Sequence, residues 1–303
     1  MRALFVPSFP GDPQVGDLPK PAPGPGELLV RVAAGSINGV DVFIGSGAGQ
    51  GMVEHRFPLV LGKDFAGVVE AVGDDVTGYA VGDAVYGTVT KPYYGAGSLG
   101  EYVTVPAEVG VTHRPDALAV HDAGALGLAG TTALLATDAL ALTKGETVLV
   151  SGATGGVGAI AVQYAAAAGA RVIATARDER QREFLASLAP VEFADYSAPL
   201  GGQVPGVDAA LHFAGDLAEI AALVKDGGRI ATTLFAADDS GRDLTLHVID
   251  AAAPQRALLD RLATDVVDGV LRVPVSTTYE LARAHEAYRD FAGGALGKIA
   301  VSM

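Results

Sequence analysis

Residues 149–163 form a glycine-rich stretch whose residue types suit the binding of a phosphate. They read LVSGATGGVGAIAVQ, an apolar run that passes through a glycine cluster into a helix-forming segment. Such a turn either connects a strand to a helix or lets a phosphate approach the backbone at a helix N-terminus. Its core is A-x-G-x-x-G, from Ala153 to Gly158, with alanine at the position of the usual first glycine. The neighbouring segments have to decide between these two interpretations.

The segments that flank the turn favour a dinucleotide site. The strand-like ETVLVSG precedes the turn, the helix-forming VGAIAVQYAAAAG follows it, and a second strand-like run, ARVIATA, comes next. This is the βαβ context that the dinucleotide fingerprint requires, in which glycines let the pyrophosphate approach and let the helix pack closely on the sheet. We therefore predict a cofactor site at the residues Ala153, Thr154, Gly155, Gly156 and Val157, with Gly158 at the helix contact.

The end of the second strand indicates which dinucleotide is bound. An enzyme that uses NAD usually places a carboxylate there, about 20 residues beyond the turn, against the ribose 2′-hydroxyl. This chain has Thr175, Ala176 and Arg177 instead. A guanidinium suits a 2′-phosphate through charge-assisted hydrogen bonds, so the segment predicts NADPH, with Arg177 as the main ligand. Arg180 and Arg182 are either further phosphate ligands or solvated helix charges.

The composition excludes several classes of partner. The 303 residues carry a formal net charge of −14, which repels nucleic acids and anionic membranes. Cysteine is absent, so disulfides and thiolate metal sites are excluded, and a cytoplasmic protein is expected. The longest weakly polar stretch, residues 123–137, is shorter than the roughly 20 residues of a membrane span. We expect no nucleic-acid partner, no membrane segment and a small-molecule substrate.

The residue composition and the hydrophobic pattern change along the chain, and these changes predict two domains. Residues 1–115 carry short β-rich runs between glycine and proline turns, and residues 266–303 add a helix and a closing strand. Residues 116–265 alternate apolar strands with helices rich in alanine and leucine. Alternation of this kind predicts a doubly wound parallel sheet of the Rossmann type. The predicted fold is α/β, with a β-rich domain that the tail completes and a separate dinucleotide-binding domain.

This order of domains resembles the medium-chain dehydrogenase/reductase superfamily over nearly the whole chain. The stretches NGVDVFIGSG, FPLVLGKDFAGVVEAVG, GDAVYG, GTTA, VDAALHFAG, GGRIATT and GKIAV together resemble its zinc-independent quinone oxidoreductase branch. The resemblance implies a GroES-like first domain. It also implies a homodimer that pairs through the late strand LTLHVI.

The resemblance implies two catalytic residues, Asn38 and Lys63. Zinc enzymes of this superfamily have a cysteine and a G-H-E at the positions that look like Asn38 and Gly62-Lys63-Asp64 here, and a carboxamide and an ammonium cannot replace those zinc ligands. Asn38 is expected to bind the nicotinamide ribose or to polarise a substrate carbonyl; otherwise it is a turn former beside Gly39. Lys63 is expected to stabilise a developing oxyanion; otherwise it is solvated or paired. Asp41 is interpreted as structural.

The resemblance also implies further cofactor contacts. Thr131 in GTTA resembles a hydroxyl near the nicotinamide half, although a helix cap is the plainer interpretation. Tyr196 resembles a residue that covers the adenosine phosphate region. The remaining predicted contacts lie at the ends of later strands or in the closing strand, and they are Phe213, Ala214, Gly215, Thr232, Thr233, Phe235 and Lys298. Apart from Lys298, these residues are otherwise ordinary residues of the core.

These residues predict an NADPH-dependent reductase that transfers a hydride to a quinone or to the β-carbon of an α,β-unsaturated carbonyl. The sequence also allows two alternatives. The chain is otherwise an enoyl reductase for thioesters of coenzyme A or a carrier, or a non-catalytic protein that responds to the dinucleotide. The loop IGSGAGQGMVEH lacks the tyrosine that this branch often carries there, so Tyr93 or Tyr94 is the candidate replacement.

Overall fold

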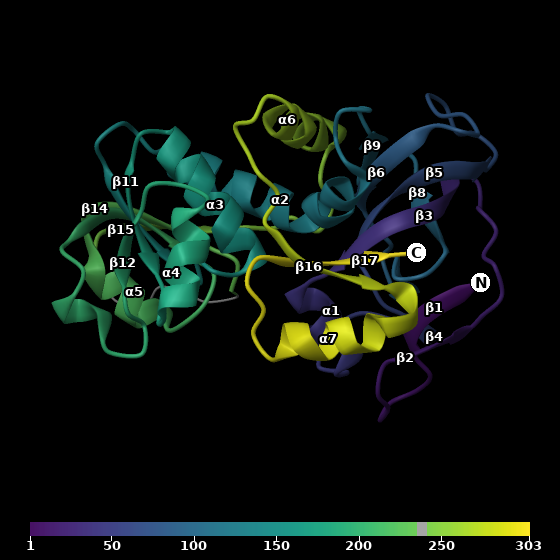
Figure 1. Ribbon diagram of the computed structural model, residues 1–303, viewed down its shortest axis with the longest axis horizontal. Helices are drawn as coiled ribbons and strands as arrows, with labels where there is room; N and C mark the ends of the chain where they lie inside the picture. The colour runs from purple at the N-terminus through teal and green to yellow at the C-terminus, as the bar shows by residue number, and fades with distance from the viewer. Residues whose placement is uncertain (235–240) are drawn as a thin grey trace. The chain divides into compact units, whose positions relative to one another are not determined.

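The structure, a computed structural model, describes residues 1–234 and 241–303, and Phe235 lies outside the described residues. The chain divides into two compact units (Figure 1). The first comprises residues 1–128, 252–267 and 275–303, and the second comprises residues 129–251 and 268–274.

The first unit is built mainly from antiparallel strands. One sheet has the order β16-β17-β3-β5-β6-β9, with β8 also paired to β3, and a smaller sheet has the order β2-β1-β4-β7. The elements are β1 (Arg2–Val6), β2 (Gln14–Asp17), β3 (Glu27–Ile37), α1 (Gly39–Gly45), β4 (His55–Val60), β5 (Asp64–Val72), β6 (Ala84–Thr88), β7 (Tyr94–Ala96), β8 (Tyr102–Pro106), β9 (Val111–His113), α6 (Arg256–Val267), β16 (Val275–Glu280), η2 (Leu281–Arg283), α7 (Ala284–Ala292) and β17 (Lys298–Ser302).

The second unit is a six-stranded sheet in which every neighbouring pair is parallel. The strand order is β12-β11-β10-β13-β14-β15, the doubly wound order in which the chain reverses direction between β10 and β13. Helix α3 packs on β10 and β11, and α5 packs on β13 and β14. The elements are β10 (Thr147–Ser151), α3 (Gly156–Ala167), β11 (Arg171–Thr175), α4 (Glu179–Ala186), β12 (Glu192–Ala194), η1 (Leu200–Gly202), β13 (Val207–His212), α5 (Leu217–Leu223), β14 (Val224–Thr232) and β15 (Leu244–Val248). The predicted fold class is confirmed.

Helix α2 (Val120–Leu140) contains the division between the units. Its 21 residues exceed the predicted apolar stretch, and by length and composition alone the helix is long enough to cross a membrane. However, 78% of its most apolar window is buried inside the protein, as expected of a core helix that is apolar on all faces. In the first unit, a side chain at Gly124 would meet the backbone of Ala34, and one at Gly127 would meet the backbone of Gly87. Glycine at both positions therefore lets the helix lie directly against the strands.

The domain boundaries predicted from the sequence differ from the boundaries of the two compact units. The sequence assigned α6 to the dinucleotide domain, whereas the compact unit places it with the β-rich strands. The hydroxyl of Tyr86 on β6 donates to the carbonyl of Leu259, and Thr112 on β9 donates to Asp260. These bonds attach α6 to the first unit. The local sequence of the helix has no pattern that predicts them.

Candidate active site

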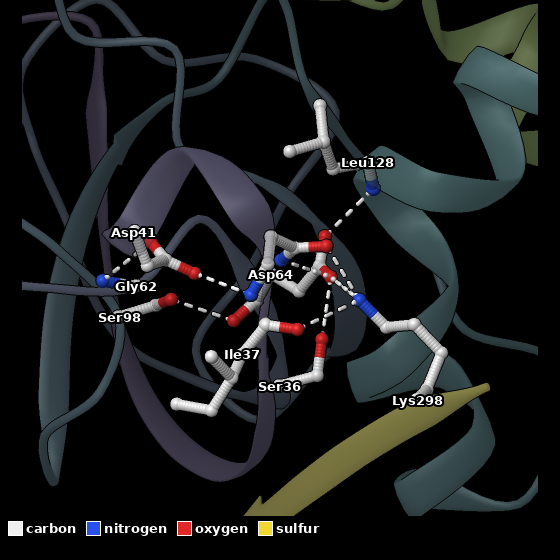
Figure 2. Close-up of polar contacts among 9 residues, drawn as sticks. Ser36, Ile37, Asp41, Gly62, Asp64, Ser98, Leu128 and Lys298 are labelled. Atoms are coloured by element: carbon white, nitrogen blue, oxygen red, sulfur yellow. Dashed lines mark hydrogen bonds and ion pairs between the residues drawn. The ribbon is translucent and has the colours of Figure 1, made fainter. Parts of the chain in front are cut away.

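Asp64 is the centre of a buried polar cluster in the first unit (Figure 2). Its side chain is fully buried at the start of β5 and accepts hydrogen bonds from four segments. The donors are the hydroxyl of Ser36 at 2.6 Å, the amide of Asn38 at 2.9 Å, the backbone N–H of Leu128 at 2.6 Å and the ammonium of Lys298 at 3.2 Å. One carboxylate thus joins β3, the start of α1, the middle of α2 and the closing strand β17.

The cluster fixes the carboxamide of Asn38. An ammonium can only donate, so the atom that faces Lys298 is Oδ1, and a carboxylate can only accept, so the atom that faces Asp64 is Nδ2. The Lys298 ammonium also donates to the carbonyl of Ile37 at 3.3 Å. Among the described residues, one N–H of the Asn38 amide makes no hydrogen bond. Lys298, predicted as a cofactor contact, is 1% exposed and is engaged by Asp64 and Asn38.

Asp41 holds the two backbone segments on either side of the cluster together. Its carboxyl oxygens accept from the backbone N–H of Asn38 at 2.8 Å, which secures the first turn of α1, and from the N–H of Gly62 at 3.1 Å (Figure 2). Burial raises the pKa of this carboxyl to about 7, and its bond to the Asn38 N–H and the cations of Lys298 and Lys63 oppose that rise. The interpretation of Asp41 as structural agrees with these contacts.

Lys63 immediately precedes Asp64 in the chain, just before β5 begins. It is partly buried and lines a hollow with both Tyr93 and Tyr94. Burial lowers the pKa of its ammonium, and the nearby carboxylates of Asp41 and Asp64 oppose the shift. Arg56 lies over the ring of Tyr93, with its guanidinium carbon 3.5 Å from the ring centroid. Lys63, Tyr93 and Tyr94 are therefore neighbours around one small hollow of the first unit.

The predicted glycine turn lies between β10 and α3 in the second unit. Gly155 precedes the helix and provides no side-chain cap, so no side chain from that position covers the first N–H groups of α3. A Cβ at Gly158 would lie 2.2 Å from the carbonyl oxygen of Gly152, whereas one at Gly155 would meet nothing closer than 3.5 Å. Gly158 is therefore required for the close packing of the helix. Gly155 leaves space beside the helix N-terminus, which fits the approach of a pyrophosphate.

The segment that follows β11 brings two other predicted residues together. The backbone N–H of Arg177 donates to the amide oxygen of Gln181, whose nitrogen donates to the hydroxyl of Tyr196 at 3.2 Å. The side chain of Arg177 is 55% exposed, and its Nε lies 3.6 Å from Oδ2 of Asp178. Nε of Arg182 is buried and has no hydrogen-bond partner among the described residues. Such an orphaned donor fits an anionic ligand at this end of the sheet.

Three predicted residues are buried in the structure. Thr175 is buried, and its hydroxyl accepts from the N–H of Gly152, so it supports the glycine turn rather than facing outward. Ala176 is fully buried beside it. Thr131 lies in the interior of α2, which begins at Val120, so its interpretation as a helix cap is wrong.

The turn from Phe213 to Gly215 is held by residues that sequence reasoning missed. Ser151 donates to the carbonyl of Ala214, and His212 is bonded at Nε2 to the carbonyl of Gly215. Because a carbonyl only accepts, Nε2 of His212 carries the proton and Nδ1 accepts from the hydroxyl of Thr232 at 3.0 Å. The buried Thr232 is thus part of this support, while Thr233 is partly exposed. The only available signal was the position of these residues at the carboxyl ends of strands.

Two family models match the chain: the alcohol dehydrogenase GroES-like domain over residues 24–116 and the zinc-binding dehydrogenase over residues 190–301. The chain is 29% identical to the chloroplastic quinone-oxidoreductase QR1 of Triphysaria versicolor, over 94% of this chain and 92% of that protein. It is 34% identical to a mycocerosic acid synthase-like polyketide synthase of Mycolicibacterium smegmatis over 93% of its residues, but spans only 14% of that protein. Comparison of the fold with the solved structure of the quinone oxidoreductase from Coxiella burnetii gives a TM-score of 0.89 at 27% sequence identity. The match covers 100% of this chain and 99% of that chain.

A GroES-like domain combined with a doubly wound parallel sheet defines a dehydrogenase or reductase that binds a nicotinamide dinucleotide. More narrowly, the chain belongs to the medium-chain dehydrogenase/reductase superfamily, in its quinone oxidoreductase branch. The resemblance stated from the sequence is confirmed at this level.

Zinc, which the name of the second family model implies, does not fit the residues present. The chain has no cysteine, and no group of three or more His, Asp or Glu side chains in the described part of the chain is placed to hold a metal ion. The Asn38 oxygen faces the Lys298 ammonium, and Lys63 presents a second cation. Because cations repel a metal ion and protonated amines cannot ligate it, these residues do not suit a zinc ion.

Proposed function

We propose that the chain is an NADPH-dependent reductase that transfers a hydride, without a metal, to a quinone or to the β-carbon of an α,β-unsaturated carbonyl. The observation that carries the proposal is that Lys63, Tyr93 and Tyr94 line one hollow, whose volume of about 10 Å³ suits a water-sized group such as the substrate oxygen. In an environment with little water, a cation and hydroxyl donors stabilise an oxygen that becomes negative during the reaction. The electrophile is expected to be a small molecule.

Each side chain has a separate task in this reaction. When bound, the reduced nicotinamide supplies the hydride. The Lys63 ammonium stabilises the enolate or phenolate oxygen that forms, and the free N–H of Asn38 donates to a ligand oxygen, either on the substrate or on the nicotinamide ribose. A solvent molecule, or a hydroxyl of Tyr93 or Tyr94, then supplies the final proton.

The preference for NADPH rests on the residues that follow β11. A buried alanine and an exposed arginine occupy the positions where a carboxylate would bind the ribose 2′-hydroxyl. The orphaned Nε of Arg182 adds a second cation in the same loop and helix. Both features support recognition of a 2′-phosphate.

Steady oxidation of NADPH tests the proposal. The purified chain is mixed with NADPH and either a benzoquinone or a cyclic enone, and absorbance at the nicotinamide band is followed. Turnover with either acceptor, greatly reduced in Lys63→Met and retained in Lys20→Met, is expected. Lys20 is a matched control because it forms an exposed ion pair with Glu70 in the same unit. Tight NADPH binding without turnover would instead support the non-catalytic alternative.

Reduction of an enoyl thioester is a second candidate. The observation that favours it is the 34% identity to a segment of a polyketide synthase. The likeness to quinone oxidoreductases extends over whole proteins, so the quinone or enone remains our first proposal. A comparison of kcat/KM for a crotonyl thioester of coenzyme A, the same thioester of pantetheine, and a quinone separates the two.

The assembly and location of the chain are further proposals. Strand β15 is an edge of the six-stranded sheet, and among the described residues it pairs only with β14. An open edge can pair with its copy about a two-fold axis, so we propose a homodimer. Because the chain has no cysteine, it suits the reducing cytoplasm, where we propose that it acts.

A further inference from the structure

A contribution to stability does not explain the buried ion pair of Asp64 and Lys298. Both side chains are at most 1% exposed. Removing two charges from water is costly, and apolar residues of similar volume often replace such pairs without loss of stability. The pair therefore calls for a role that apolar residues cannot perform.

We propose that Asp64 and Lys298 are positioning residues, which hold the Asn38 carboxamide in the one orientation that keeps an N–H available to the ligand. The inference rests on the proposed function, because it assigns to Asn38 a hydrogen bond to a ligand oxygen. Neither Asp64 nor Lys298 touches the ligand in this scheme. They act only through Asn38.

The chemistry of the two partners makes the orientation unambiguous. Rotation of the Asn38 amide by 180° would place its N–H₂ against the Lys298 ammonium and its oxygen against the Asp64 carboxylate. Both contacts would then be repulsive, because two donors and two acceptors would face each other. With an apolar residue on either side, this preference would weaken.

The position of Asn38 explains why orientation matters there. It immediately precedes α1 and is 7% exposed, so the residue lies almost wholly inside the protein. In the observed orientation its side chain retains one N–H without a partner among the described residues. In the flipped orientation it would present an oxygen to the ligand oxygen, and the hydrogen bond would be replaced by repulsion.

Asp64 is held independently of Asn38, as a positioning residue must be. Its Oδ1 accepts from the backbone of Leu128, and its Oδ2 accepts from Ser36 as well as from Asn38. Lys298 is likewise held by the carbonyl of Ile37. Two anchored charges therefore fix a third, neutral group.

Variants that separate charge from orientation test the inference. Asp64→Asn and Lys298→Met are made singly and together, with Asn38→Ala alone and in the double background, and with the surface pair Lys20→Met/Glu70→Gln as the matched control. Each single variant is expected to unfold at a lower denaturant concentration, because it leaves one buried charge unpaired. The double variant is expected to recover most of that loss.

Turnover is expected to behave differently from stability. In the double variant kcat should stay about ten- to a hundredfold below the parent value, and Asn38→Ala should lower kcat no further in that background. The control should retain the parent kcat. The inference is overturned if the double variant regains both the unfolding midpoint and kcat, or if Asn38→Ala lowers kcat as much in the double variant as in the parent.

A readout without turnover separates this inference from the proposed function. Failure of the parent chain to oxidise NADPH with any acceptor contradicts the proposed function. The exchange of the Asn38 side-chain amide protons with solvent, followed by NMR, still reports its orientation. Slow exchange in the parent and at least tenfold faster exchange in the double variant support the positioning role, whereas equal rates overturn it.

Discussion

The ammonium of Lys298 lies 3.2 Å from the carboxylate of Asp64, although 234 positions separate the two residues in the chain. The contact is possible because the closing strand β17 pairs with β3, which in turn pairs with β5. The last residues of the chain are therefore a component of the candidate site. A truncation before β17 would remove a charge from its centre.

The first prediction concerns the pH dependence of stability. The folded protein keeps a proton on Asp41 up to about pH 7, because burial raises its pKa from 3.8 to about 7. The unfolded chain loses that proton near pH 4, so it binds fewer protons than the folded protein between these values. The contribution of Asp41 to the free energy of unfolding therefore falls as pH rises from about 4 to about 7 and is constant above that range.

Denaturant unfolding at several pH values measures this contribution. Asp41→Asn removes the titrating group, so its free energy of unfolding should fall less steeply between pH 4 and pH 7 than that of the parent protein. Parallel slopes for the two proteins over that range would contradict the assignment to Asp41.

The second prediction concerns Arg177 and the choice of dinucleotide. A hydrogen bond to a charged group contributes about 1.5 to 3 kcal/mol, so Arg177→Ala should weaken NADPH binding roughly ten- to a hundredfold and leave NADH nearly unchanged. Titration of each dinucleotide by calorimetry measures both effects. Arg171→Ala is the control, since Arg171 lies at the opposite end of β11 and pairs with Glu192. Equal weakening of both dinucleotides would show that Arg177 acts through folding.

The sequence was sufficient for the fold because its signals are local. The βαβ unit around the glycine turn and the alternation of strands and helices after it require only neighbouring residues, and the structure forms the strands that these runs predict. The length of α2 was harder to predict from the sequence. Its apolar residues surround the helix evenly, so no periodic pattern marks where it begins.

The candidate site could be predicted only in part, because its contacts join residues that are far apart in the sequence. Lys63 and Asn38 could be selected through their motifs, but the partner of Asn38 lies 260 positions away on another strand. No local pattern links Asp64 to Lys298, or His212 to Thr232. Such contacts depend on which strands pair, and this is settled only by the packing of the whole unit.

The third prediction is independence from metal ions. The positions that resemble zinc ligands hold Asn38 and Lys63, and the chain contains no cysteine. Turnover should survive exhaustive chelation, and elemental analysis should find no stoichiometric zinc. Activity that disappears on chelation and returns with zinc alone would contradict the proposed metal-free reaction.

The fourth prediction is a homodimer formed through β15. Val248, at the end of this edge strand, is 52% exposed. A lysine on an edge strand opposes pairing, so Val248→Lys should convert a dimer into a monomer in light scattering while the thermal midpoint of the monomer fold persists. A parent protein that is monomeric at all concentrations would rule out the assembly.

The last prediction separates the roles of Lys63 and Asn38 in the chemical step. An interaction that strengthens in the transition state lowers kcat when it is removed, rather than weakening NADPH binding. Lys63→Met should therefore lower kcat more for an enone, which forms a full enolate, than for a quinone, whose ring spreads the charge. Asn38→Ala should lower NADPH affinity as well as kcat if its amide binds the nicotinamide ribose, and kcat alone if it polarises the substrate carbonyl.

The pH profile of kcat provides a second test of Lys63. Burial lowers the pKa of its ammonium, so the rate should fall as pH rises through a value below that of an exposed lysine, because the charge is lost. Lys63→Arg keeps the charge at high pH and should move this decline upward or abolish it. If Lys63→Met and Asn38→Ala both reduce both acceptors at the parent rate with saturating NADPH, neither side chain is an electrophilic catalyst. Cofactor positioning and the shape of the hollow would then account for the reaction.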